Sequence, residues 1–243
     1  MERQRLTRRK TLAGLAAAGI GGVAGCTGDG GDGSDGGDGG DGGDGGDGGD
    51  GGDGGDGGDG GGGGSVSGTV SIGVLQPLSG SLSYYGEQAL YGFFQGFNYK
   101  GDEEFAPEAS TGTKTATVGD VDYELIIRDT ELAADTAQSA AQDLVTNEDV
   151  DMLFGCTSSA SASRVATTVS KQADVTTMLG PAASASITSN SETCGEQVFR
   201  ASENVAMDAR SGGKYVAENT DVESVYMYGA DYSFGRSVVN NYR

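Results

Sequence analysis

Short runs of β-branched and apolar residues alternate along the chain with longer stretches of helical periodicity. The runs TVSIGVL at 69–75, VDYELIIRD at 121–129, VDMLFG at 150–155 and VTTMLG at 175–180 predict four strands. Strands that alternate with helices of 10–15 residues are typical of a parallel sheet with helices on both faces. The pattern therefore predicts an α/β fold built on a doubly wound parallel sheet.

Helical periodicity fills the intervals between these strands. A first helix presents Leu90, Phe93, Phe94 and Phe97 at i, i+3, i+4 and i+7. A second helix over 133–147 has an apolar face, and a third is predicted over 161–173. Between the first helix and Gly119 the chain is polar and rich in Gly and Thr, which favours a loop. The apolar face of the second helix consists of Ala137, Ala140, Ala141, Leu144 and Val145.

The first 25 residues follow neither pattern. Five basic residues precede an apolar run at 12–25, which is shorter than the roughly 20 apolar residues that cross a bilayer. A basic start, a short apolar run and small residues before a cut site indicate an export signal. The pair Arg8-Arg9 resembles a twin-arginine signal, and VAGC at 23–26 resembles a lipobox. We therefore expect residues 1–25 to be removed and Cys26 to be lipidated, the alternative being an unmodified thiol in a disordered leader.

Residues 26–64 are dominated by a Gly-Gly-Asp repeat. From Gly28 to Gly64 the tract has no apolar side chain and no Lys or Arg, so it cannot offset the chain entropy that folding costs. A Gly-rich coil of this length spans about 35 Å. Gly occupies two positions of three and Pro is missing, which excludes a collagen helix, while weak calcium binding stays an alternative. The tract is interpreted as a tether between a lipid anchor and a domain that begins near residue 65.

Charge excludes several classes of partner. The chain has 15 Lys and Arg against 36 Asp and Glu. Loss of residues 1–25 leaves ten basic and 35 acidic residues, a net charge of −25. Such a chain binds neither nucleic acid nor an anionic lipid surface by its charge. High salt screens this self-repulsion, so the composition favours a halophilic source.

The reactive side chains are few. The chain contains no His, which removes the commonest general base and metal ligand, so neither an enzyme nor a metal site is expected. Cys156 and Cys194 are consistent either with a disulfide or with two separate buried thiols. No Gly-rich nucleotide-binding motif follows any strand. We expect no cofactor.

Three loops follow predicted strands and each leads into a helix: PLSGSLSYYGE at 77–87, CTSSASAS at 156–163 and GPAASASIT at 180–188. Ligands of parallel α/β sheets bind at the carboxyl ends of the strands. Backbone N–H groups at helix starts and nearby hydroxyls suit a carboxylate or a similar polar group. Each Ser could instead simply cap its helix. Three such loops at one edge favour a small polar ligand.

Five motifs stand in order along the chain: IGVLQPLSGSLSYYGEQALYG at 72–92, LFGCTSSASASRVA at 153–166, MLGPAASASIT at 178–188, VFRASENVAMDARSGGKYV at 198–216 and VYMYGADYSFGRS, with a strand and a Tyr-Gly turn, at 225–237. Together they resemble type I periplasmic solute-binding proteins of the branched-chain amino acid class. The resemblance implies an extracellular, lipid-anchored component of an ABC importer, which delivers an amino acid to a membrane permease and its ATPase. It divides the chain into a first solute-binding lobe at 65–204 and an incomplete start of a second lobe at 205–243.

The resemblance also implies ligand contacts. The family's hydroxyl after the third strand falls on Ser158 or Ser159, because one extra residue leaves the choice open. The small residues after the fourth strand fall on Ala182 and Ala183, whose backbone groups would meet the ligand. The next hydroxyl falls on Ser184 if one residue is missing just after it; without that gap Ala183 takes the place.

Two aromatic residues complete the predicted site. Tyr85 matches the aromatic residue that flanks the family's pocket, or is an ordinary half-buried Tyr. Phe234 stands where a Tyr is usual and offers an apolar wall without a hydroxyl. About 39 residues follow Asn204, too few for a second independent core, so we expect a fragment or truncated product. A receptor for urea, an amide or another small polar solute, a sensory ectodomain and a surface adhesin are the alternative functions.

Overall fold

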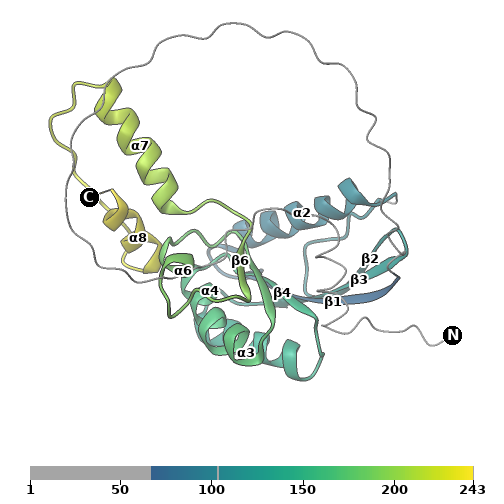
Figure 1. Cartoon of the computed structure of the whole chain (residues 1–243). Helices are drawn as coiled ribbons and strands as arrows, with labels where there is room; N and C mark the ends of the chain where they lie inside the picture. Colours follow the sequence, from purple (N-terminus) through teal and green to yellow (C-terminus); the bar gives the residue numbers. More distant parts are fainter. Residues whose placement is uncertain (1–66, 103, 243) are drawn as a thin grey trace, which may run out of the picture.

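A single mixed sheet organises the protein. The computed structural model describes residues 67–102 and 104–242 (Figure 1). The six strands of the sheet lie in the order β2-β3-β1-β4-β5-β6. All neighbouring strands are parallel except β2 and β3, which are antiparallel, so the predicted parallel α/β sheet is confirmed. The strands are β1 (Gly68–Gln76), β2 (Gly112–Val118), β3 (Val121–Asp129), β4 (Met152–Gly155), β5 (Thr176–Leu179) and β6 (Val198–Arg200).

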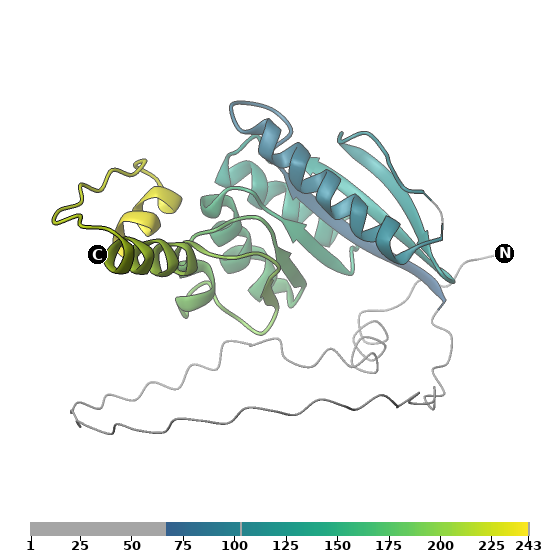
Figure 2. The same cartoon turned by 90° about the horizontal axis from the view of Figure 1, so that it is seen from above.

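Helices cover both faces of the sheet, as a doubly wound fold requires. Helix α2 lies on one face and α3 and α4 lie on the other (Figure 1), and α2 runs along the sheet in the view from above (Figure 2). The predicted helix at 161–173 forms and starts two residues earlier, as α4, η1 and α5 in direct succession. The helices are α2 (Ser83–Lys100), α3 (Ala134–Thr146), α4 (Ser159–Val165), the π-helical turn η1 (Ala166–Ser170), α5 (Lys171–Ala173), α6 (Ser186–Ser189), α7 (Val205–Asn219) and α8 (Ser233–Asn241).

Two hydrophobic clusters form the core, one on each face of the sheet. On the α2 face, Leu90 and Phe94 are buried against strand residues such as Val74, and Phe93 and Phe97 pack at the margin. The opposite face buries the Ala-rich side of α3 against Leu153 and its neighbours. The helical faces predicted from periodicity are therefore the faces that pack on the sheet.

The loop predicted up to Gly119 is wrong in part, because it contains β2. This strand pairs with β3 along its whole length, and Gly119, with φ of 57°, begins the turn between them. Only Ala116 of β2 is buried, since the strand lies at the edge of the sheet and contributes little to the core. Alternating threonines at 113, 115 and 117 are the signal that the composition of the loop obscured.

The strand expected at the start of the second lobe is also absent. Residues 220–230 form no regular secondary structure, and Val225, Tyr226 and Tyr228 are 64%, 90% and 90% exposed. A strand needs a neighbour to accept its backbone hydrogen bonds, and none lies beside this segment within the described residues. The apolar run is therefore present in the sequence without the pairing that would make it a strand.

Cys156 is a free, buried thiol, so the disulfide between Cys156 and Cys194 is not formed. Burial raises the pKa of Cys156 to about 12, which keeps this thiol protonated and unreactive at neutral pH.

The predicted export signal at 1–25, the lipidated Cys26 and the tether at 26–64 lie outside the described residues. Among the helices that are described, none combines the length and the apolar character that a membrane span requires.

Candidate functional site at the carboxyl edge of the sheet

Three loops meet at the carboxyl edge of the central strands. They are the β1 loop (77–82), the β4 loop (156–158) and the β5 loop (180–185). Leu75 pairs with Gly155, and Phe154 pairs with Met178, so the three strands end at nearly the same level. The polar loops that the sequence predicted to converge therefore do so.

Two adjacent serines with different surroundings lie where the β4 loop ends, at Ser158, and α4 begins, at Ser159. Ser158 is half-buried and caps α4, because its hydroxyl oxygen accepts a hydrogen bond from the Ser161 N–H at 3.4 Å. Ser159 is buried, and its hydroxyl oxygen accepts a hydrogen bond from the Ser184 N–H at 3.2 Å. Both hydroxyls therefore use a lone pair within the protein and keep their own proton for another acceptor.

The β5 loop is held by its backbone. The Ala182 N–H donates to the Cys156 carbonyl at 3.1 Å, and the Ala183 carbonyl accepts from the Val205 N–H at 2.9 Å. Ser184 is buried, and its hydroxyl lies 2.9 Å from the hydroxyl of Ser186. The contacts fix the loop between the β4 loop on one side and the start of α7 on the other.

Arg200, at the end of β6, binds the β5 loop through its guanidinium group. Its guanidinium donates to the carbonyls of Ala182 and Ser184, the latter at 2.8 Å, and to the Thr188 hydroxyl at 3.3 Å. Burial lowers the pKa of Arg200, and the nearby carboxylate of Glu203 opposes this effect. Arg200 is not among the site residues predicted from the sequence, although it stands in the VFRASENVAMDARSGGKYV motif.

Gln76, at the end of β1, joins the β4 and β5 loops. This side chain is fully buried at the end of β1; its amide N–H donates to the Gly180 carbonyl at 2.9 Å, and its amide oxygen accepts from the Thr157 hydroxyl at 2.7 Å. Sequence reasoning missed both residues of this pair. The available signal was a polar residue that closes an otherwise apolar strand.

Asp129 fixes the β1 loop. Its carboxylate accepts hydrogen bonds from the N–H groups of Leu78 and Glu131, each at 2.8 Å. Burial acts to raise the pKa of Asp129, but bonds from the Ser79 hydroxyl and from the N–H groups of Leu78, Glu131 and Ser79 outweigh it. The pKa of this carboxyl group therefore lies below its ordinary 3.8.

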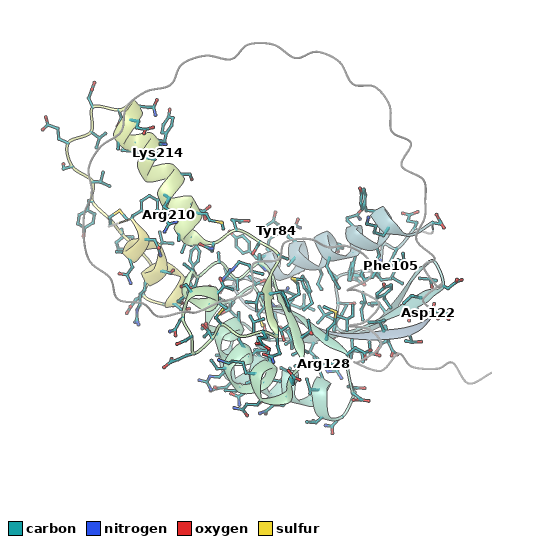
Figure 3. All side chains as sticks on the ribbon, viewed as in Figure 1. Tyr84, Phe105, Asp122, Arg128, Arg210 and Lys214 are labelled. Carbon is teal, nitrogen blue, oxygen red and sulfur yellow. The ribbon has the colours of Figure 1, made fainter. Side chains whose placement is uncertain are left out.

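Tyr85 lies in the first turn of α2 and is 56% exposed. Its ring meets that of Tyr84 edge to face, with centroids 5.6 Å apart, and Figure 3 shows Tyr84 at the start of α2. Gly86 makes this placement possible, because a Cβ there would meet the Pro77 carbonyl oxygen at 1.9 Å. The two rings are available to a ligand beside the β1 loop.

Phe234 lies in the first turn of α8 and is 36% exposed, with its ring stacked on Tyr232 at 6.1 Å between centroids. Helix α8 is tied to the β5 loop, because the Ala185 N–H donates to the Ser237 hydroxyl at 3.2 Å. This bond connects the helix that carries Phe234 to the loop that carries Ser184.

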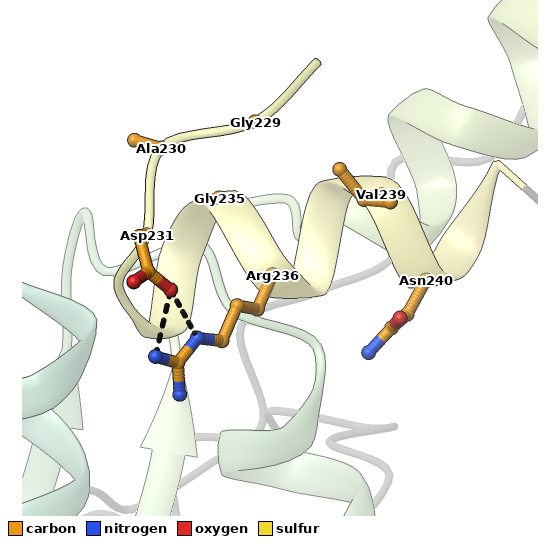
Figure 4. Close-up of a pocket in the computed structure, with 7 residues that line it drawn as sticks. All are labelled: Gly229, Ala230, Asp231, Gly235, Arg236, Val239 and Asn240. Atoms are coloured by element: carbon orange, nitrogen blue, oxygen red, sulfur yellow. Dashed lines mark hydrogen bonds and ion pairs between the residues drawn. The ribbon is translucent and has the colours of Figure 1, made fainter. Parts of the chain in front are cut away.

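Two hollows of the described surface lie away from these loops. One of about 440 Å³ lies along α8 (Figure 4), where Arg236 and Asp231 form an ion pair at 2.7 Å. Another of about 450 Å³ lies beside α2 and β3. None of the predicted site residues lines either hollow. We place the candidate site on the open carboxyl edge, because the loops after β1, β4 and β5 converge there.

The chemistry of this edge is hydrogen bonding. The loops present hydroxyls and backbone groups, and the one thiol among them is buried and protonated. In the part of the chain that the structure describes, no three His, Cys, Asp or Glu side chains are placed to hold a metal ion. The arrangement suits recognition of a small polar ligand.

The fold and the loop arrangement agree with the family comparison. A model of the family described as periplasmic binding protein matches residues 69–243. The chain belongs to this family. Comparison with curated proteins finds no match.

Solved structures of ABC-transporter proteins share the fold. A solute-binding protein from Rhodopseudomonas palustris BisB5, in complex with 3,4-dihydroxybenzoic acid, is 22% identical with a TM-score of 0.60. A substrate-binding protein from Sphaerobacter thermophilus is 23% identical with a TM-score of 0.61. An ABC-type branched-chain amino acid transporter protein from R. palustris CGA009 is 22% identical with a TM-score of 0.50. The matches cover 71–72% of this chain but only 42–43% of those chains, so this chain spans less than half of their length.

Proposed function

We propose that this chain is the extracytoplasmic solute-binding component of an ABC importer and that it captures a branched-chain or related amino acid. The observation that carries the proposal is the convergence of the β1, β4 and β5 loops at one edge of a periplasmic-binding-protein sheet, where Gln76 at the end of β1 bonds both other loops and Ser184 bonds Ser159 at the start of α4. Family membership supports a role in binding rather than catalysis. The implied partners are the permease and ATPase subunits.

The carboxylate of the ligand is assigned to the β4 and β5 loops. Ser158 and Ser159 keep hydroxyl protons, and α4 begins beside them with the positive end of its dipole. Tyr85 and Phe234 are exposed aromatic surfaces that suit an apolar tail better than a sugar. A free carboxylate with a short apolar body satisfies both features.

An aromatic carboxylate is a second candidate. The exposed, mutually packed rings of Tyr84 and Tyr85 favour it, because an aromatic ligand could stack beside them. The R. palustris BisB5 neighbour was solved with such an acid. Titration of leucine, valine, 4-hydroxybenzoate, urea and glucose against the same protein separates the candidates.

The test of the site is a titration of the full chain followed by amide NMR shifts, which detects weak binding. Ser158→Ala and Ser184→Ala should each weaken carboxylate binding by roughly tenfold, because a hydrogen bond to a charged group contributes about 1.5–3 kcal/mol. Ser139→Ala on α3, whose hydroxyl donates to the Asp135 carbonyl, is the matched control. Glucose as the best ligand, or unchanged affinity in both site variants while thermal melting shows that they fold, would contradict the site.

We further propose that Cys26 carries a lipid anchor at the outer face of the cytoplasmic membrane. The sequence VAGC after a basic, apolar leader supports this. Two acyl chains are needed for stable anchoring, since one binds only marginally. Cys26→Ser should appear in the medium or stay unprocessed, and a variant as membrane-bound as wild type would overturn the anchor.

A further inference from the structure

The orientation of the Gln76 amide is fixed by its partner on β5. A backbone carbonyl accepts hydrogen bonds and never donates them, so the group that faces the Gly180 carbonyl at 2.9 Å is the amide nitrogen. The amide oxygen then faces Thr157. Because Gln76 is fully buried, water does not compete for either group.

This orientation determines what the Thr157 hydroxyl can do. The amide oxygen of Gln76 carries no proton, so the Thr157 hydroxyl must donate in the 2.7 Å bond between them. A hydroxyl has one proton and two lone pairs. Thr157 is half-buried and lies in the β4 loop, and toward the open edge it can therefore act only as an acceptor.

The adjacent residue, Ser158, has the opposite hydrogen-bonding role. Ser158 accepts from the Ser161 N–H and keeps its proton, so it can donate to a ligand. Two consecutive, half-buried hydroxyls thus present an acceptor at Thr157 and a donor at Ser158. A ligand with an N–H group beside a carboxylate matches this order.

We propose that Thr157 is a specificity-determining residue, which accepts a hydrogen bond from the α-ammonium of an amino acid, and that Gln76 is the positioning residue that holds it in the accepting state. The inference rests on the proposed function, because it assumes a carboxylate ligand at this edge. It adds a reason to prefer an α-amino acid over a carboxylic acid without a nearby donor. A free hydroxyl could rotate to serve either ligand, but a hydroxyl locked on Gln76 cannot.

The test compares leucine with 4-methylpentanoate, which lacks only the α-ammonium, by NMR titration of the full chain. Wild type should prefer leucine. Thr157→Val should reduce the ratio of the two affinities by roughly tenfold through weaker leucine binding, the scale of one hydrogen bond to a charged group. Thr157→Ser, which restores the hydroxyl, should keep the ratio within about twofold of wild type.

Gln76→Met removes the amide oxygen that accepts the Thr157 proton and leaves Thr157 itself unchanged. It therefore tests the proposal if Thr157→Val fails to fold. The hydroxyl is then free to donate, so 4-methylpentanoate should gain affinity and the ratio should fall. Equal weakening of both ligands, or an unchanged ratio, would show a purely structural role and overturn the inference while leaving the proposed function intact. A wild-type chain that binds no carboxylate would overturn the proposed function, and the inference with it.

Discussion

Two regions of this protein are built from similar residues and have opposite surroundings. In the lobe from β1 to β6, apolar side chains such as Val74 and Leu153 are fully buried between sheet and helices. In the C-terminal segment at 205–242, Val225 and Tyr226 are exposed, and only Val205, Ala209 and Gly235 are buried. Figure 1 shows α7 extending away from the sheet. An apolar residue contributes to stability through the neighbours that cover it, and its type alone does not provide them.

The largest contrast is expected in proteolysis. Chymotrypsin should cut first after Tyr226 or Tyr228, which are exposed in a segment without regular structure, while cuts in the lobe require unfolding. Because opening the lobe costs most of its folding free energy, these cuts should be at least about a thousandfold faster. Mass spectrometry of samples taken during the digestion identifies the cleavage sites and their order. Early cleavage between β1 and β6 would break the comparison.

The next contrast is between two aromatic substitutions. Phe94→Ala should reduce the free energy of unfolding by about 3–5 kcal/mol, because it leaves a cavity in the α2 face of the core. Tyr226→Ala should change it by less than about 0.5 kcal/mol. Urea denaturation followed by circular dichroism measures both. Similar reductions in the free energy of unfolding for the two variants would mean that the Tyr226 side chain is buried in solution.

Two arginines sharpen the comparison at a smaller scale. Arg200→Met should cost about 1.5–3 kcal/mol, because it removes the charged donors that hold the carbonyls of Ala182 and Ser184. Arg236→Met is the control, since its ion pair with Asp231 is largely exposed and should contribute about 0.5 kcal/mol or less. Equal costs would show that Arg200 does not support the β5 loop.

The smallest expected effect concerns acid stability. The folded-state pKa of Asp129 lies below its ordinary 3.8, so its ionised form stabilises the fold above that pH. The contribution is lost as the pH falls through the folded-state pKa. Urea midpoints of wild type and Asp129→Asn should therefore differ at pH 6 and converge only as the pH falls below 3.8 and through the folded-state pKa. A difference that is constant with pH would exclude this carboxylate as the source.

Much of the candidate site could be predicted from the sequence, because loops after parallel strands must share an edge. The convergence of the loops that carry Ser158, Ser159 and Ser184 follows from that rule. The donor and acceptor roles within the site could not be predicted. In the sequence, Gln76 is only the last residue of a strand and Arg200 is only one residue of a motif. The fold brings Gln76 beside Thr157 and Gly180, and it brings Arg200 beside carbonyls that lie 16 and 18 residues away.

The sequence by itself determined the α/β fold, the order of the helices and the faces that they bury, since hydrophobic periodicity is a local property of the chain. Only the tertiary structure decided that 112–118 is a strand and that 225–228 is not, because strand formation depends on a neighbour that supplies hydrogen bonds. Only the tertiary structure fixed the direction of the Thr157 proton, because it depends on a buried amide 81 residues away.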